Sequence, residues 1–331
     1  IIMNGCMPGA ETPKIAILMA VYEPRLDWLR EQLLSLEEQT YPNIKLYIRD
    51  DCSPAVPIEA IQACVSESIR SFSWELWRNE KNLGSTGTFE RLTAEAEGAY
   101  FAYCDQDDIW LPEKLSLLQK EIERERAKLV CSDMYVIDRQ GRRTADSITQ
   151  VYKRFRFYSG EGLAEKLLIR NFVAGCTMLI RADTARAALP FCPYMIHDHY
   201  LALKAAMCGK IASLPRPTIS HRIHGENQTG SMQGITDKRS YYDKQILQHV
   251  KRLIWLRENI DGALNFAAVI DQAVIWTRAR SDYFSGKWKS WWEIWKYRHF
   301  SVVTSLFELI FARMPEFIFM FLIRLRQKRI L

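Results

Sequence analysis

Long apolar segments without charge are missing from this 331-residue chain, although 48% of its residues are hydrophobic. No run reaches the roughly 18 residues that a membrane-spanning helix needs, so we expect no such helix. The eight cysteines include no pair at C-x-x-C spacing. This absence argues against a zinc site or a disulfide framework and favours small, buried, reduced cysteines. Residues Ile1 to Thr12 lack the charged-then-apolar order of a signal peptide.

Excess positive charge is also missing from most of the chain. The net charge is +6, and the segment from Lys287 to Leu331, with nine Lys/Arg and three Glu, accounts for all of it. A general nucleic-acid binder carries basic residues along its working face. The balanced charge before Lys287 therefore argues against nucleic acid as a partner.

Short apolar runs alternate with helical patterns in the first half of the chain. Helical spacing follows Leu26 and Pro57, and another helix is expected near Thr88. Strands are predicted at Ile15 to Val21, Ile44 to Ile48, Trp74 to Trp77, Ala99 to Cys104 and Leu129 to Cys131. This alternation predicts an α/β fold with a mostly parallel sheet. We expect a tail at 1–13, a catalytic domain at 14–230, and a helical, basic, Trp-rich region at 231–331.

Acidic or polar clusters stand at the carboxyl ends of three predicted strands. They are Tyr22-Glu23, Asp50-Asp51 and the run from Asp105 to Asp108. In open α/β sheets this edge binds ligands. The carboxylates of Asp105 and Asp107 suit Mg²⁺ or Mn²⁺, and such an ion stabilises a diphosphate leaving group. One D-x-D triplet is common in loops, but its place after an apolar strand gives it weight.

A set of motifs resembles family 2 of the inverting glycosyltransferases over roughly residues 14 to 230. The resemblance rests on order and spacing more than on any single motif. In chain order the motifs are Ala20-Val21-Tyr22-Glu23-Pro24, Gln39-Thr40-Tyr41-Pro42, Arg49-Asp50-Asp51-Cys52-Ser53, Asn82-Leu83-Gly84, Asp105-Gln106-Asp107-Asp108, Asn171-Phe172-Val173-Ala174-Gly175, His197-Asp198 and His221-Arg222-Ile223-His224-Gly225. The run from Asp105 to Trp110 is similar to bacterial polysaccharide transferases, including rhamnosyltransferases.

The resemblance implies a GT-A fold, a Rossmann-like nucleotide-diphospho-sugar transferase, with a helical C-terminal extension. It implies a nucleotide-sugar site made of Ala20, Val21, Tyr22, Glu23, Asp50, Asp51, Asn82, Gly84, Asp105 and Gln106. Asp51 is the first choice for the base contact and Asp50 the second. For Lys81, beside Asn82, a surface role weighs at least as much as a nucleotide contact. Cys52 departs from the family, where a small residue such as Gly is usual.

The resemblance also makes Asp198 the catalytic base, because it occupies the position of the family's acidic dyad. An inverting transfer needs one carboxylate to take the proton of the attacking hydroxyl. The competing interpretation is a helix N-cap, since an apolar helical pattern follows from Leu201. His197 stands where the dyad has Glu, so its role stays open.

The remaining motif residues are less specific. His221 and His224 are expected in a loop shaped by Pro215, Pro217 and Gly225. They would contact the metal or the diphosphate, His224 foremost as a metal ligand with Asp105 and Asp107, or belong to a solvated basic loop. Residues expected on the acceptor side or left without a role are Trp110, Gly175, His197, His221 and Arg222.

The C-terminal region combines tryptophan with lysine and arginine. Trp288, Trp291, Trp292 and Trp295 lie among basic residues, and an apolar stretch follows before Arg324. This composition favours helices lying on an anionic membrane surface; a helical cap or a dimer interface is the alternative. We therefore expect a peripheral enzyme at the cytoplasmic face of a bacterial inner or plasma membrane. It would use a dTDP- or UDP-sugar and a lipid-linked or nascent polysaccharide; whether it forms a homo-oligomer stays open.

Two other functions fit part of the pattern. A sugar nucleotidyltransferase shares the fold and the metal, but should carry a Gly-rich, Arg-containing loop where this chain has Ala20 to Pro24. A non-catalytic subunit that binds nucleotide-sugars has no need for Asp198 or the D-x-D triplet. Both features therefore favour an enzyme, a metal-dependent glycosyltransferase.

Overall fold

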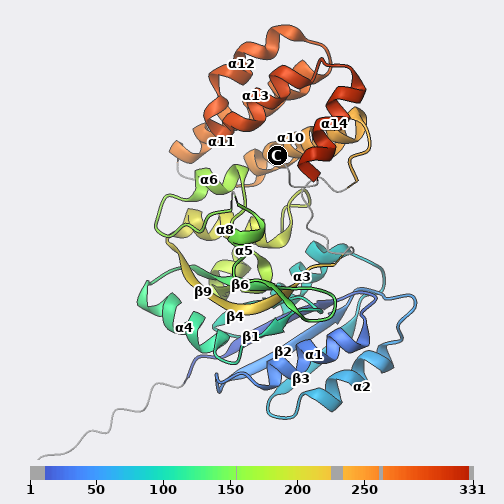
Figure 1. Cartoon of the computed structure of the whole chain (residues 1–331). Helices are drawn as coiled ribbons and strands as arrows, with labels where there is room; N and C mark the ends of the chain where they lie inside the picture. Colours follow the sequence, from blue (N-terminus) through green and yellow to red (C-terminus); the bar gives the residue numbers. More distant parts are fainter. Residues whose placement is uncertain (1–11, 154, 225–233, 261–263, 328–331) are drawn as a thin grey trace, which may run out of the picture.

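The computed structural model describes residues 12–153, 155–224, 234–260 and 264–327. An α/β body carries a group of helices, α10 to α14, at one end of the molecule (Figure 1). The predicted boundary near Gly230, most of the tail before Lys14, and the basic residues Lys328 and Arg329 lie outside the described residues.

One nine-stranded sheet forms the centre of the body. Its order is β3-β2-β1-β4-β8-β6-β9-β5, with β7 paired to β6. The strands are β1 (Ile15–Val21), β2 (Ile44–Asp50), β3 (Ser73–Arg78), β4 (Tyr100–Cys104), β5 (Ile109–Trp110), β6 (Leu129–Ile137), β7 (Arg143–Ala145), β8 (Met178–Arg181) and β9 (Ile211–Arg222). The five predicted strands are thus confirmed to within a few residues, except that β6 is longer than expected.

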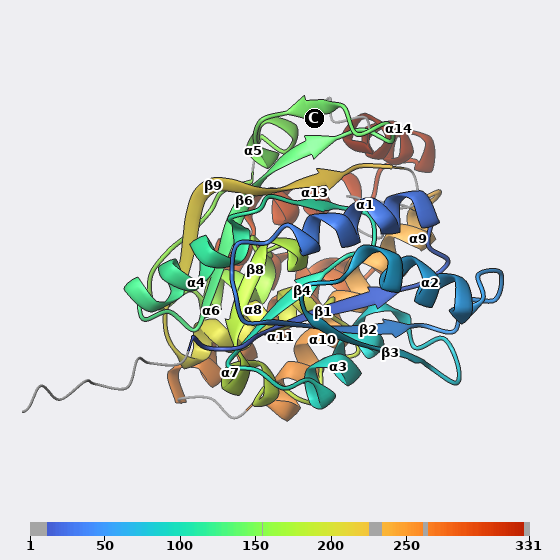
Figure 2. The same ribbon diagram turned by 90° about the horizontal axis from the view of Figure 1, so that it is seen from below.

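The sheet is parallel only in its first half. Strands β3, β2, β1 and β4 are parallel neighbours and lie side by side when the molecule is seen from below (Figure 2). Beyond β4 the directions are mixed, because β8 runs antiparallel to both β4 and β6, and β5 runs antiparallel to β9. The expectation of a mostly parallel sheet therefore holds for the first half and is wrong for the second.

Alternate residues of β1 pack into different cores, as the two-residue period of a strand requires. Ile15, Ile17 and Met19 face helices α1 (Leu26–Glu37), α2 (Ile58–Ser68) and α4 (Lys114–Arg124). Ala16 and Leu18 face α3 (Gly84–Glu95), α6 (Ala164–Ile169), α7 (Ala182–Arg186) and α8 (His197–Cys208), whereas α5 (Ile148–Val151) packs in the core of Ile15, Ile17 and Met19. Helix α3 begins four residues before Thr88, at Gly84, whose φ of +72° turns the chain into the helix.

The C-terminal region is helical throughout its described residues. It contains α9 (Lys238–Tyr241), a π-helix at Tyr242–Leu247, α10 (Gln248–Asn259), α11 (Leu264–Phe284), α12 (Trp291–Lys296), α13 (Val302–Phe311) and α14 (Glu316–Gln327). Leu253 and Leu256 of α10 and Ile270 of α11 share one core with α8. Within the described residues, no helix combines the length and the apolar character needed to cross a membrane.

Candidate active site

The candidate site lies where β1, β2 and β4 end. Val21 pairs with Asp50 across β1 and β2, and Met19 pairs with Cys104 across β1 and β4. The loops that follow these strands therefore leave the sheet at one edge. This register brings together the three polar clusters that the sequence analysis placed at strand ends.

The side chain of Gln106 joins two of these loops. Its Oε1 accepts a hydrogen bond from the backbone N–H of Tyr22 at 2.8 Å, and its Nε2 donates to the backbone carbonyl of Tyr22 at 3.0 Å. The amide thus pairs with the chain as a neighbouring strand would. It holds the predicted nucleotide loop against the acidic loop, whereas its contact with a nucleotide stays a prediction.

The carboxylates of Asp50 and Asp51 have different surroundings. Asp50 is fully buried and receives hydrogen bonds from Arg78 Nε at 2.6 Å and from Ser53 Oγ at 2.5 Å. In Asp51, Oδ1 accepts from Asn79 Nδ2 and from the N–H of Leu83, each at 2.8 Å. Among the described residues no donor reaches Oδ2 of Asp51. Of the pair, Asp51 retains an oxygen for a ligand.

The loop after β2 turns through Cys52, whose φ is +61°. This left-handed conformation costs a residue with a side chain about 1–2 kcal/mol, so the tight turn expected where the family has Gly forms despite the thiol. Ser53 Oγ accepts from the N–H of Glu23, and Glu23 Oε1 accepts from the N–H of Ala55, each at 2.8 Å. These bonds tie the loop after β1 to the loop after β2.

Asn82 and Gly84 form the start of α3. Asn82 Oδ1 accepts a hydrogen bond from the N–H of Gly84 at 3.0 Å. Lys81 and Asn82 are both exposed, and a helix N-terminus attracts anions. The geometry leaves their predicted contact with the nucleotide open to test.

Three carboxylates converge in the acidic loop. Burial, then the charges of Asp108 and Asp107, raises the pKa of Asp105 above its ordinary value. Burial and Asp108 likewise raise the pKa of Asp107, while a hydrogen bond to His224 opposes the shift. Repulsion among crowded carboxylates of this kind is relieved by a bound cation.

Two groups of side chains offer ligand atoms for that cation. In the first, Asp107 Oδ2 lies 2.7 Å from His224 Nε2, and Asp105 stands two residues before Asp107. In the second, the ligand atoms of Asp108, Cys176 and His221 lie within 4.8 Å of one another. However, Asp108 Oδ1 already accepts from His221 Nδ1 at 2.9 Å and from the N–H of Arg222 at 3.0 Å. Asp107 is likewise bonded to His224, so the choice of Asp105, Asp107 and His224 as metal ligands stays a prediction.

The loop predicted around His221 is wrong, because β9 extends from Ile211 to Arg222. Residues Pro215 and Arg216 are bypassed where the β6–β9 register shifts, between the pairs Ser132–Leu214 and Asp133–Pro217. A proline fits such a bulge because its missing N–H is not needed there. His221 and Arg222 are thus held rigidly against the acidic loop, while His224 follows the strand.

The contacts of Arg222 indicate a structural role. Its side chain is buried, and its Nε donates to the backbone carbonyl of Asp107 at 2.9 Å. It also donates to the carbonyls of Asp138 and Arg139, at 3.3 Å each, and pairs with Glu31. We conclude that Arg222 fixes the backbone of the acidic loop.

Trp110 is buried too, and a lysine that the sequence analysis missed lies on it. The Lys114 ammonium is 3.2 Å from the centroid of the Trp110 indole and donates to the backbone carbonyl of Cys176. Burial lowers the pKa of Lys114 to about 8. These contacts place Trp110 beneath the site as packing for α4 and the acidic loop.

Asp198 lies in the first turn of α8, where Ile196 occupies the N-cap position. The N-cap interpretation of Asp198 is therefore wrong. Its carboxylate accepts a hydrogen bond from the N–H of Gly175 at 3.0 Å and another from Asn171 Nδ2 at 3.1 Å. Burial raises the pKa of Asp198 to about 6. A carboxylate with this pKa, held by two donors, suits a general base near neutral pH.

His197 points into the core. Its ring centroid is 4.1 Å from that of Phe89 and 5.4 Å from that of Tyr103. Burial lowers the pKa of His197 to about 3, so the imidazole is neutral. A Cβ atom at Gly175 would lie 2.8 Å from His197 Nε2. Gly175 is thus required by the packing of His197, beneath Asp198.

We expect Gly175→Ala to destabilise the chain and to slow any reaction that depends on Asp198. The added methyl group must displace the imidazole of His197, and overpacking of this kind costs about 1–3 kcal/mol. The midpoint of urea unfolding measures the loss. In Gly175→Ala/His197→Ala the clash is absent, so the double variant should be no less stable than His197→Ala alone. A fully additive loss would contradict this packing role.

Asn171 is the positioning residue that the sequence analysis did not single out, although it begins one of the quoted motifs. Its Nδ2 also donates to the carbonyl of Val173 at 2.7 Å, and its Oδ1 accepts from the N–H of Val173 at 2.9 Å. The amide is therefore fixed in one orientation, with its donor toward Asp198. Its proximity to Asp198, 27 residues away in sequence, is a result of the fold.

A sequence model described as glycosyl transferase family 2 matches residues 16–186. TuaG of Bacillus subtilis (strain 168), which carries the name of a teichuronic acid biosynthesis glycosyltransferase, is 24% identical over 180 residues, 54% of this chain and 66% of TuaG.

Two solved structures are similar in fold. S. aureus TarS 1–349 in complex with UDP-GlcNAc has a TM-score of 0.57 at 18% identity, over 82% of this chain and 73% of that one. The mannosyltransferase PcManGT from Pyrobaculum calidifontis, in complex with GDP-Man and Mn²⁺, has a TM-score of 0.53 at 13% identity, over 90% and 76% of the two chains. The predicted GT-A fold with a helical C-terminal region is confirmed.

Proposed function

Because the chain belongs to glycosyl transferase family 2, we propose that it transfers a sugar from a nucleotide diphosphate-sugar to a saccharide acceptor with inversion at the anomeric carbon. Asp198 carries this proposal. It is a buried carboxylate with two fixed donors and a pKa of about 6, so that it is mostly ionised at pH 7 and ready to accept a proton.

The proposed reaction is one displacement. The acceptor oxygen bonds to the anomeric carbon as the bond from that carbon to the diphosphate oxygen breaks. Asp198 takes the proton of the acceptor hydroxyl, and the nucleotide diphosphate leaves with the bonding electrons. Asn171 and the N–H of Gly175 hold the carboxylate in place during this transfer.

A divalent cation would neutralise the charge that develops on the departing diphosphate. Asp105, Asp107 and His224 are the residues that would hold it. Hard carboxylate oxygens suit both Mg²⁺ and Mn²⁺, but Mg²⁺ strongly prefers oxygen ligands. The imidazole of His224 therefore favours Mn²⁺. The structure of PcManGT, which contains Mn²⁺, supports the same choice.

The nucleotide would lie along the loops after β1 and β2. Asp51 Oδ2 is available to accept a hydrogen bond from a base N–H, whereas Asp50 supports the loop through Arg78 and Ser53. We propose a dTDP- or UDP-sugar, with rhamnose as the first sugar to test. The UDP-GlcNAc bound in TarS supports including UDP-sugars.

The function is tested by release of nucleotide diphosphate from a panel of dTDP- and UDP-sugars, with Mn²⁺ or with EDTA. We expect release in Mn²⁺, faster when saccharide acceptors are added. A nucleotide diphosphate that binds the folded state should also raise the thermal midpoint. Stabilisation without any turnover would indicate a non-catalytic binding subunit. If no nucleotide diphosphate stabilises the chain, the proposal fails.

The acceptor is proposed to be a lipid-linked or nascent bacterial cell-surface polysaccharide, reached from the cytoplasmic face of the membrane. The name of TuaG supports this class of acceptor. We also propose that 14–230 form the catalytic unit and that 231–331 form a region that contacts the membrane.

Helix α13 supports the membrane contact because its exposed face is apolar. Its inner face carries Ser305 and Glu308, and Glu308 is only 1% exposed. Its outer face carries Val302, Val303 and Ile310, which are 49%, 49% and 52% exposed. Exposed apolar residues grouped on one face of a helix are typical of interaction surfaces.

The neighbouring helices extend this apolar face. Trp292 of α12 and Phe317 and Phe321 of α14 are all at least half exposed. Helices α12, α13 and α14 gather at one end of the molecule (Figure 1). Lys289 and Lys296, which lie close to Trp292 in sequence, are also exposed. Tryptophan, lysine and apolar residues together suit an anionic lipid surface.

We expect the chain to co-sediment with anionic vesicles at low salt, less at high salt, and poorly with neutral vesicles. Each basic residue near the surface contributes about 1 kcal/mol, and salt screens this contribution. Truncation near Ser285 would leave Arg280 without Glu308, so substitutions on the outer face give the cleaner test. The triple variant Trp292→Gln/Ile310→Gln/Phe317→Gln should stay in the supernatant.

The matched control for this variant is Leu34→Gln, which removes an exposed apolar side chain from α1. It should leave sedimentation unchanged. If the triple variant binds vesicles as well as the native chain does, the outer face serves another purpose, such as a dimer interface.

A further inference from the structure

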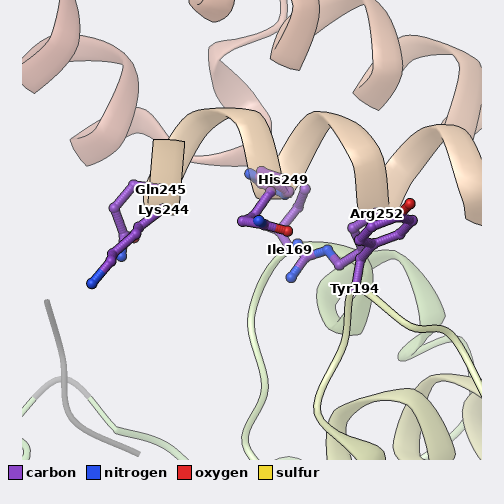
Figure 3. Close-up of a pocket in the computed structure, with 7 residues that line it drawn as sticks. Ile169, Tyr194, Lys244, Gln245, His249 and Arg252 are labelled. Carbon is purple, nitrogen blue, oxygen red and sulfur yellow. The ribbon is translucent and has the colours of Figure 1, made fainter. Parts of the chain in front are cut away.

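A cavity of about 280 Å³ lies between the catalytic body and the C-terminal helices. Side chains from the π-helix and α10 form one wall, and the end of α6 and the loop before α8 form the other (Figure 3). The polar lining residues are Tyr194, Lys244, Gln245, Gln248, His249 and Arg252. There is no acidic side chain in this lining, so its charge is positive.

Arg252 is a partly exposed cation that has no carboxylate partner among the described residues. Its Nη2 donates to the backbone carbonyl of Leu168 at 3.0 Å, but its Nε is buried without a partner. Burial, with opposition from Cys192 and help from the nearby charge of Arg280, lowers the pKa of Arg252 to about 10, so it stays charged. A partly buried charge without a counterion is unfavourable, and an anion in the cavity would supply the counterion.

His249 adds a second unused donor. Arg280 Nη1 donates to His249 Nδ1 at 3.0 Å, which places the imidazole proton on Nε2, and that atom is buried without a partner. Burial and the charges of Arg252 and Arg280 lower the pKa of His249 well below its ordinary value. Arg280 itself is neutralised by Glu308, so the uncompensated charge belongs to Arg252.

Two segments of the cavity wall continue toward the proposed base and its donor. Ile169, which lines the cavity, is two residues before Asn171, and two residues of extended chain span at most about 7 Å. Asn171 donates to Asp198, and Tyr194 of the same cavity is four residues before Asp198. The segments that carry Asp198 and its donor Asn171 thus also contribute residues to the cavity wall.

We infer that this cavity binds a phosphate or diphosphate group of the acceptor, an inference that rests on the proposed function. The lining offers two cationic side chains and two amides, and one of the cations, Lys244, also donates to the carbonyl of Gly234 at 3.0 Å. These are more donors than one carboxylate can use, whereas a diphosphate has enough oxygens for them. The cavity has the volume of roughly nine water molecules at ~30 Å³ each, which also accommodates a diphosphate.

Inorganic pyrophosphate in EDTA is the probe, and calorimetry is the measurement. EDTA removes the metal through which pyrophosphate could enter the proposed donor site. We expect Arg252→Gln to bind pyrophosphate about tenfold more weakly or worse, because a hydrogen bond from a charged donor is lost. Its thermal midpoint should be no lower than that of the native chain, since the variant removes a partly buried charge without a counterion. Unchanged affinity would overturn the inference.

Lys244→Gln provides a second variant that should not disturb folding, because Lys244 is exposed. It should also weaken pyrophosphate binding. Lys251→Gln is its matched control, since Lys251 is an exposed lysine of α10 that does not line the cavity. Equal effects of the two substitutions would show a general charge effect and overturn the inference.

Two further titrations identify the source of the phosphate. Saturation with a nucleotide diphosphate should leave pyrophosphate binding intact, and competition between them would assign the probe to the donor site and overturn the inference. Vesicles of phosphatidylglycerol should not displace pyrophosphate. If the vesicles displace pyrophosphate, and if Lys244→Gln weakens this displacement, the cavity binds lipid headgroups. That result would overturn the assignment to the acceptor. If pyrophosphate binds through Arg252 but no nucleotide diphosphate binds anywhere, the proposed function fails while the anion site stands.

Discussion

The variant Asp198→Asn should lose about 10²-fold or more in turnover while it still binds the donor. The amide keeps the shape of the carboxylate but cannot take a proton, and general-base catalysis is worth about 10²- to 10⁴-fold. Steady-state release of nucleotide diphosphate in the presence of acceptor measures the loss. Calorimetry with a nucleotide diphosphate measures donor binding.

The control is Asp183→Asn, which makes the same change in the first turn of α7. It should retain native turnover. Turnover of the native chain should also decline as the pH falls through about 6, where Asp198 becomes protonated, and the residual activity of Asp198→Asn should lack this decline. Turnover near the native level in Asp198→Asn would leave Asp198 with a structural role in α8 and would remove the proposed mechanism.

The variant Asp107→Ala should lose the dependence of nucleotide binding on Mn²⁺. Asp107 and His224 present adjacent ligand atoms, 2.7 Å apart, and without the carboxylate the ion keeps only His224 and Asp105. We expect at least a tenfold loss in affinity for UDP or dTDP in Mn²⁺, equivalent to about 1.4 kcal/mol. Calorimetry in Mn²⁺ and in EDTA measures both states.

Asp146→Ala serves as the control, because it removes the exposed carboxylate of Asp146, which directly follows β7. Binding in EDTA should be similar in all three proteins, since the loops after β1 and β2 are unaltered. If Asp107→Ala binds nucleotide as tightly as the native chain in Mn²⁺, the ion is held elsewhere; the group of Asp108, Cys176 and His221 would then become the place to look.

The first half of the sheet was predictable because its strands carry local signals, which are apolar runs in β1 and β4 and alternation of apolar with polar residues in β2. Ile15 to Val21 and Tyr100 to Cys104 are buried on both faces, as parallel central strands are. Strand β9 was missed because two prolines interrupt it. Strand β9 accommodates these prolines because it bulges opposite Ser132 and Asp133 of β6. The bulge arises from the pairing of β9 with β6, which the sequence of β9 alone does not indicate.

The candidate site was predictable where one strand end delivers several residues, as in the run from Asp105 to Asp108. The contacts that tune the site were not. Lys114 reaches the carbonyl of Cys176 across 62 residues, and Gln106 reaches Tyr22 across 84. Such contacts arise from strand order, which periodicity in a single sequence does not determine. His197 shows the same limit, since only the fold places it between Phe89 and Tyr103.

The buried ion pair of Arg280 and Glu308 determines how α13 is rotated about its own axis. Glu308 accepts two hydrogen bonds from Arg280, at 2.6 and 2.7 Å, and one from Tyr241 at 3.0 Å. Rolling α13 until Leu306 and Ile310 faced inward would remove Phe307 and Phe311 from the core that they share with Phe319. Rolling would also leave a buried arginine without its partner, which is strongly unfavourable. The ion pair therefore selects one rotational state of α13. In this state Val302, Val303 and Ile310 are exposed on the surface.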